Sequence, residues 1–144
     1  GLSAEIGATS AQADVDTINA VRDYGRLLGR AFQIQDDYLE LFSDSKNMGK
    51  SLCSDIVLGK KTFLIIHALQ KNSQYINNAM DLARISFDKG LIKICDFIKE
   101  NGIHETALKE INNLIELADI TLCKLNIKKE NLLYFSELIR QRGK

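Results

Sequence analysis

The sequence predicts an all-α protein, and three observations support this. Apolar residues recur at steps of three and four along most of the 144 residues, and the alternation typical of half-buried strands is scarce. Gly90 and Gly102 fall where expected helices end and need a left-handed residue. No repeat or low-complexity linker interrupts the pattern, so we expect one domain at most.

The elements follow in order from the same periodicity. A short first helix leads into the turn at residues 13–16, which holds an aspartate suited to an N-cap. A long second helix begins at Asp16 or Thr17 and ends at Phe42, and residues 43–60 form the main loop. The expected helices are 3–12, 16–42, 62–70, 73–88, 91–100, 104–125 and 129–142.

The second half of the chain has few polar groups that converge, and we expect it to be scaffold. The helix at 104–125 carries a wide apolar stripe, formed by Ile103, Ala107, Ile111, Leu114, Ile115, Ala118, Leu122 and Leu125. His67 lies in an apolar run and is expected to be a hydrogen-bonded core histidine, with a catalytic base as the alternative. Tyr24 and the other tyrosines are expected to pack with one end in water.

The segment from Phe32 to Glu40 is the part of the chain most indicative of function, because acidic residues interrupt an otherwise apolar helix. At about 100° per residue, four polar side chains project from an arc of about 100°. They are Gln33, Asp36, Asp37 and Glu40. Like charges one turn apart oppose helix formation by about 0.2–0.5 kcal/mol. We therefore expect a bound cation to neutralise these carboxylates. Oxygen ligands on a helix suit Mg²⁺, which substrate phosphates commonly help to hold.

The alternative for this segment is the solvated stripe of an ordinary amphipathic helix. Gly25 and Gly29 continue the same stripe at a cost of about 1 kcal/mol each, which favours close approach of another backbone or a ligand. Downstream, Lys50 and Lys60 each follow a glycine, around Asp55. Lysine is a compact charge suited to phosphate oxygens. Carboxylates followed by lysines are the groups needed to bind and ionise a diphosphate.

This set resembles the second aspartate-rich region of the trans-isoprenyl diphosphate synthases, the polyprenyl synthetase family. The matching residues are Gly29, Phe32-Gln33, Asp36-Asp37-Tyr38-Leu39-Glu40, Gly49-Lys50, Asp55, Gly59-Lys60-Lys61-Thr62, Gly102-Ile103-His104-Glu105-Thr106-Ala107 and Arg140-Gln141-Arg142-Gly143-Lys144. The resemblance covers nearly the whole chain. It implies a helical bundle of the isoprenoid synthase type, here represented by its C-terminal helices, with residues 1–144 as the C-terminal portion of one synthase domain.

The resemblance also implies roles for single residues. Asp36 would ligate Mg²⁺ directly, and Asp37 and Glu40 would act through metal-bound water. Gln33, Lys50 and Lys60 would contact the allylic diphosphate as catalytic residues. Phe32 would border the substrate pocket, and Arg142 and Lys144 would belong to a basic tail over the diphosphate. The full-length enzyme would condense an allylic diphosphate with isopentenyl diphosphate as a homodimer, and this portion alone would be inactive.

Departures from the family pattern leave other functions open. Glu40 stands where the family usually has Asp, and no second Asp-Asp pair occurs in the 144 residues, so the first aspartate-rich motif is absent. One alternative is a non-catalytic, synthase-like subunit that partners a complete prenyl synthase. Others are a related prenyl-diphosphate cyclase or a plain helical binding module.

Composition excludes several classes of protein. The formal net charge is +0 with dispersed Lys and Arg, which argues against a nucleic-acid surface. No apolar run reaches the roughly 18–20 residues of a transmembrane helix, and no signal peptide is visible. Cys53, Cys95 and Cys123 are widely spaced, which argues against a zinc site and predicts a reducing cytoplasm.

Overall fold

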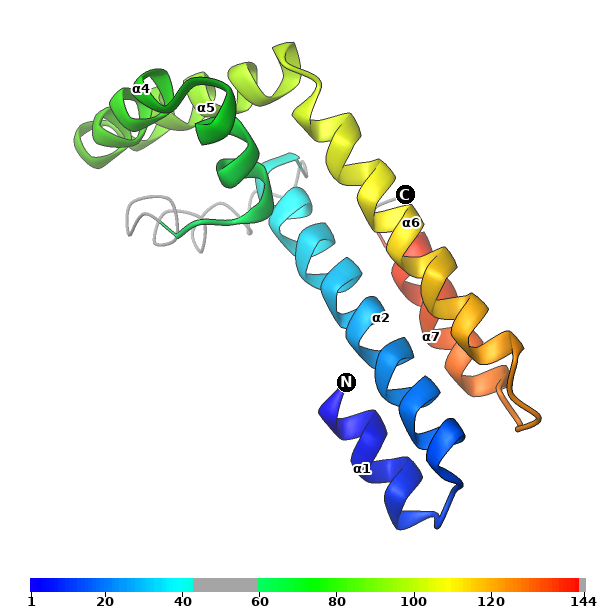
Figure 1. Ribbon diagram of the computed structural model, residues 1–144. Coiled ribbons are helices and arrows are strands. Elements are labelled where there is room, and N and C mark those ends of the chain that lie inside the picture. Colours follow the sequence, from blue (N-terminus) through cyan, green and yellow to red (C-terminus); the bar gives the residue numbers. More distant parts are fainter. Residues whose placement is uncertain (43–59, 143–144) are drawn as a thin grey trace. The chain divides into compact units, whose positions relative to one another are not determined.

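The computed structural model describes residues 1–42 and 60–142. The described residues form six helices and no strand, which confirms the all-α prediction (Figure 1). The helices are α1 (Leu2–Ser10), α2 (Val15–Phe42), α4 (Phe63–Ile85), α5 (Phe87–Glu100), α6 (Ile103–Cys123) and α7 (Glu130–Gln141). Most of the loop expected at 43–60 lies outside the described residues.

The chain divides into two compact units, and the divisions fall inside α2 and α6. The first unit comprises Gly1–Gln33 with Lys109–Lys144, and the second comprises Ile34–Leu108. None of the described helices combines the length and the apolar character that crossing a bilayer requires.

In the first unit, α1 lies along the N-terminal part of α2 (Figure 1). Asp14 caps α2, because its carboxylate accepts the backbone N–H of Thr17 at 2.9 Å, and this confirms the aspartate expected there. A Cβ added to Gly25 would lie 3.1 Å from Ala4 Cβ and from Gly1 backbone atoms. The glycine therefore serves close approach of another backbone. A Cβ on Gly29 would meet nothing within 4 Å, so no such contact explains that residue.

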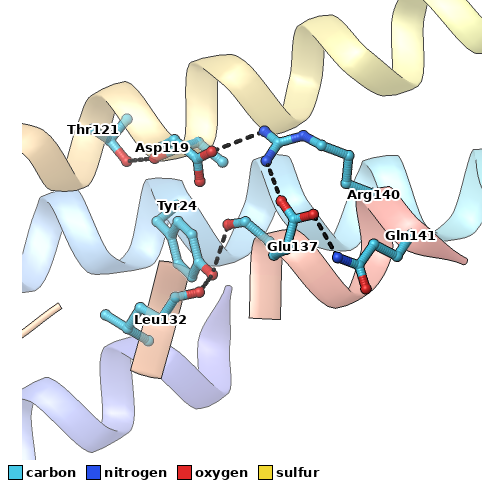
Figure 2. A network of polar contacts seen from close by, with 9 residues as sticks. Tyr24, Asp119, Thr121, Leu132, Glu137, Arg140 and Gln141 are labelled. Carbon is cyan, nitrogen blue, oxygen red and sulfur yellow. Dashed lines mark hydrogen bonds and ion pairs between the residues drawn. The ribbon is translucent and has the colours of Figure 1, made fainter. Parts of the chain in front are cut away.

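Helix α7 is anchored in the first unit by polar side chains (Figure 2). The Tyr24 hydroxyl from α2 donates to the Leu132 carbonyl and lies 3.2 Å from Ser136 Oγ. Tyr24 is only 3% exposed, so the expectation that its hydroxyl reaches water is wrong. The hydroxyl end is buried because the backbone and Ser136 of α7 supply the partners that water would otherwise provide.

An ion-pair network continues this anchorage. The Arg140 guanidinium donates to Asp119 of α6 at 3.0 Å and to Glu137 of its own helix at 2.8 Å. Gln141 donates to the second oxygen of Glu137 at 2.8 Å (Figure 2). The hydrogen bonds to Glu137 and Asp119 raise the pKa of Arg140, so α7 is joined to α6 by a permanent positive charge.

In the second unit, α4 combines two of the expected helices. Asn72 has non-helical angles (φ −155°, ψ 90°) inside α4, at the gap predicted between residues 70 and 73. Its side chain accepts the N–H of Tyr75 at 3.0 Å. Asn72 therefore ends one helical segment and caps the next, as short polar side chains do at helix starts.

Gly90 does not end a helix, contrary to the prediction. It lies inside α5, which begins at Phe87, whereas the sequence predicted a helix end at 88 and a start at 91. A Cβ on Gly90 would lie 2.4 Å from the Ala83 Cα and N. The glycine is needed because α4 and α5 pack side by side at this point (Figure 1). Gly102, by contrast, has φ +66° and is the left-handed residue predicted.

The stripe predicted for α6 is part of the core. Seven of its eight residues are buried, which confirms the interpretation of this stripe as core. They are Ile103, Ala107, Ile111, Leu114, Ile115, Ala118 and Leu122. His67 is not the core residue that the sequence predicts, because its ring is half-buried against Phe63, with ring centroids 4.4 Å apart.

Candidate active site

Gln33 and the three carboxylates singled out in the sequence lie in the C-terminal half of α2. Asp37 is only 7% exposed, Asp36 and Glu40 are half-buried, and Gln33 is exposed. Helical geometry puts Asp37 at the edge of the four-residue arc, next to the buried position of Ile34. The carboxylates therefore lie between the solvated face and the core-facing side of α2, rather than along a fully solvated stripe.

The last turn of α2 is held by its neighbours in the second unit. The Cys95 thiol of α5 donates to the Leu41 carbonyl at 3.8 Å, and Lys99 Nζ lies 5.4 Å from the centroid of the Phe42 ring. The His104 ring lies 6.2 Å from that of Phe42. These contacts fix the helix end that carries Glu40. Burial raises the pKa of the Cys95 thiol to about 11, so the thiol is an inert packing group at neutral pH.

In the first unit, Phe32 borders an apolar groove of about 360 Å³ between α2 and α7. The other lining residues are Leu28, Phe135, Leu138, Ile139 and Arg142. The Arg142 guanidinium lies 4.5 Å from the centroid of the Phe32 ring. This cation–π contact joins Arg142, from the expected basic tail, to Phe32, which precedes Gln33. Such a contact is typically worth about 0.5–1 kcal/mol at exposed sites.

The remaining basic residues are placed only in part. Lys60 is exposed, three residues before α4 begins. Lys50 and Lys144 lie outside the described residues. One polar residue was missed by the sequence reasoning: Gln35 is 7% exposed and lies on the opposite side of α2 from Gln33. Its position among buried neighbours Ala31 and Ile34 was the available signal.

The donor set on α2 suits a hard cation, but the residues that the structure describes do not supply a complete cage. Among residues 1–42 and 60–142, no group of three or more His, Cys, Asp or Glu side chains is placed to hold a metal ion. A protein site for Mg²⁺ commonly has one or two carboxylates, with water and substrate phosphates as the other ligands. The carboxylates of Asp36, Asp37 and Glu40 fit that incomplete type of site, and their assignment as metal ligands stays a prediction.

Comparison with known proteins places these features in a family. The family model for polyprenyl synthetase matches residues 1–90, which include all of α2 and α4. A short chain isoprenyl diphosphate synthase of Methanocaldococcus jannaschii is 46% identical over 68 residues, covering 47% of this chain and 21% of the relative.

Two further relatives match over most of the chain. A geranylgeranyl diphosphate synthase of Sulfolobus acidocaldarius is 33% identical over 149 residues, covering 99% of this chain and 45% of the relative. Geranylgeranyl pyrophosphate synthase 2 of Gibberella fujikuroi is 27% identical over 138 residues, covering 90% of this chain and 35% of the relative. The chain thus spans less than half the length of these curated relatives. Because the family model matches well over half of its residues, the chain belongs to the polyprenyl synthetase family.

Proposed function

We propose that this chain supplies the second aspartate-rich motif of a trans-prenyltransferase active site. The complete enzyme would join an allylic diphosphate to isopentenyl diphosphate. The observation that carries the proposal is the row of three carboxylates on α2, one of them nearly buried, within the segment matched by the family model. Relatives named as geranylgeranyl and short chain isoprenyl diphosphate synthases support the same reaction class. No relative reported above is named as a non-catalytic subunit.

The residues of this chain would bind and orient the diphosphate. Asp36 would hold Mg²⁺ directly, while Asp37 and Glu40 would hold its water ligands. Bound Mg²⁺ would neutralise the charge that grows on a diphosphate leaving group. The Gln33 amide and the Lys60 and Lys50 ammonium groups would donate hydrogen bonds to the remaining oxygens and stabilise the same charge.

The contact between Phe32 and Arg142 supports a role for the C-terminal tail in this proposal. The Phe32 ring holds the Arg142 guanidinium at 4.5 Å, and Arg142 would add a positive charge for the diphosphate, as the family resemblance implies. Lys144 would extend the same basic tail. Phe32 itself presents 43% of its surface, enough to border the apolar part of an allylic substrate.

The proposal is tested first by binding. Isothermal titration of the chain with geranyl diphosphate should show binding that requires Mg²⁺, and Asp36→Asn should weaken it at least about tenfold, since a charged ligand is lost. Asp23→Asn is the matched control, because Asp23 is an exposed acid on the same helix. Binding that is equally tight without Mg²⁺, or equally tight in Asp36→Asn, contradicts the proposed site.

Turnover tests the enzyme assignment. A protein that contains this chain together with a first aspartate-rich motif should elongate geranyl diphosphate with labelled isopentenyl diphosphate. Asp36→Ala should lower kcat/KM by about 100-fold or more, which corresponds to about 2.7 kcal/mol of transition-state stabilisation. Absence of turnover in that protein would instead favour a non-catalytic, synthase-like partner.

Two further parts of the proposal concern the protein's state. We propose a homodimer, which the family resemblance implies and sedimentation velocity can test. We also propose a cytoplasmic location, which is supported by the free thiols of Cys95 and Cys123 in the described part of the chain.

A further inference from the structure

A small pocket in the second unit has no part in the proposed reaction. Its volume is about 230 Å³, and it opens between α4 and the N-terminal turn of α6. Its lining residues are His67, Gln70, Lys71, Asn101, Ile103 and Thr106. None of the residues assigned above to metal or diphosphate binding lines it.

The lining favours an anion over a cation or an apolar ligand. Lys71 brings a full positive charge, and no Asp or Glu is among the six lining residues. His67, Gln70 and Asn101 add polar N–H groups, whereas Ile103 is the single aliphatic member. A concave site with charge of one sign raises the local concentration of the opposite ion. Lysine in particular suits phosphate oxygens as a point charge.

Contacts around the pocket hold several of these side chains in place. The His67 ring lies on Phe63 at 4.4 Å between centroids. Asn101 Nδ2 donates one hydrogen to the Phe97 carbonyl at 2.9 Å, which leaves its second amide hydrogen for a ligand. Thr106 Oγ1 donates to the Gly102 carbonyl at 3.0 Å and so is not a donor to the pocket. The available donors are therefore those of His67, Gln70, Lys71 and Asn101.

We propose that this pocket binds a small phosphate-bearing anion. Its volume lies below the range of about 300–1,000 Å³ typical of sites for drug-sized ligands. Its lining offers a prenyl chain only one aliphatic side chain, so an isolated phosphate or diphosphate group suits the pocket better. Two sources share this chemistry. One is cellular inorganic phosphate, and the other is the inorganic diphosphate released by prenyl transfer.

The test uses the purified chain with a chelator present, so that metal-dependent binding at α2 does not contribute. Inorganic phosphate and diphosphate are titrated at constant ionic strength against chloride, and the imidazole NMR signals of His67 and His104 are followed. We expect the His67 signal to shift with a saturable dependence on anion, and Lys71→Ala to weaken this binding about tenfold or more. Lys93→Ala is the matched control, since Lys93 is an exposed lysine of α5 outside the pocket.

The outcomes separate the sources and the two proposals. Much tighter binding of diphosphate than of phosphate would identify the reaction product as the ligand, and equal binding would identify phosphate groups in general. A His67 signal that responds no more to phosphate than to chloride, or equal weakening by Lys71→Ala and Lys93→Ala, would overturn the proposal. Because the assay contains no metal, its result is independent of the effect of Asp36→Asn on geranyl diphosphate binding.

Discussion

Helices α5 and α7 are each fixed against a neighbouring helix, but by opposite means. In α5 the contact depends on a missing side chain, since Gly90 lets the backbone of Ala83 approach to a distance that no Cβ tolerates. In α7 the contact depends on polar groups from two other helices, namely the Tyr24 hydroxyl and the Asp119 carboxylate. A steric contact of the first kind is lost entirely on substitution. The polar contacts that hold α7 are several, and their combined strength depends on pH and salt concentration.

The largest effect is expected at Gly90. Gly90→Ala would place a methyl group 2.4 Å from backbone atoms of Ala83, and backbone cannot move aside as a flexible side chain can. We expect a loss of about 2 kcal/mol or more, because overpacking outweighs the gain of about 1 kcal/mol that Ala gives within a helix. Urea unfolding followed by far-UV circular dichroism measures the change.

Gly29→Ala is the matched control for Gly90. Its Cβ would meet nothing within 4 Å inside α2, so this variant should gain about 0.5–1 kcal/mol. If the two variants changed stability alike, the steric account of the contact between α4 and α5 would fail. If Gly29→Ala also weakened Mg²⁺-dependent binding of geranyl diphosphate, the glycine would serve ligand approach, as the sequence suggested.

A smaller effect is expected for the polar anchorage at Tyr24. Tyr24→Phe removes the hydroxyl that donates to Leu132 and contacts Ser136, which is 1% exposed. Because buried partners lose a hydrogen bond, the expected cost is about 1–2 kcal/mol. Thermal unfolding of Tyr24→Phe beside Tyr134→Phe, whose ring is 61% exposed, isolates the buried hydroxyl. An equal cost in both variants would count against the anchorage.

The same hydroxyl predicts a pH dependence. Burial raises the pKa of Tyr24 above its ordinary value of 10.0. A raised pKa stabilises the folded state fully below the unfolded-state pKa, and this stabilisation is lost as pH rises through the folded-state value. The stability difference between the wild type and Tyr24→Phe should therefore be constant up to about pH 9 and shrink above pH 10. A difference that does not change between pH 8 and 11 would show that the hydroxyl is not held in its neutral form.

The ion pair between Arg140 and Asp119 should contribute less. Both side chains are partly exposed, at 34% and 24%, so solvent screens their attraction. A double-mutant cycle with Arg140→Met and Asp119→Asn should give a coupling energy of about 1 kcal/mol or less, which falls as salt is raised. A coupling that is insensitive to salt would place the pair in a drier environment than its exposure indicates.

The smallest effect on stability is expected at the end of the chain. Arg142→Met would remove a cation–π contact to Phe32 that is worth about 0.5 kcal/mol. If the contact seats the tail for substrate, the same variant should raise the Kd for Mg²⁺-geranyl diphosphate severalfold, and Arg142→Lys should restore part of it. If Arg142→Met bound Mg²⁺-geranyl diphosphate as tightly as the wild type, Arg142 would have no role in the proposed site.

The starts and ends of several helices were predictable because they depend on the chemistry of single residues and their close neighbours. Asp14 and Asn72 start helices through their own side chains, and Gly102 ends one through a left-handed φ that other residues rarely adopt. The location of the acidic turns within one long helix was also predictable, because helical spacing puts Gln33 and the carboxylates on one arc whatever surrounds them.

The helices, their polar and apolar faces and the family resemblance on α2 could be read from the sequence, since these depend on residues within a few turns of one another. Three features became visible only in the folded chain: Gly90 is a packing site whereas Gly102 is a helix end, the Tyr24 hydroxyl is buried, and His67 lines a pocket. Each of these depends on atoms brought from distant parts of the chain, as Gly90 on Ala83 and Tyr24 on Leu132 show. Such contacts leave no periodic signal in the sequence.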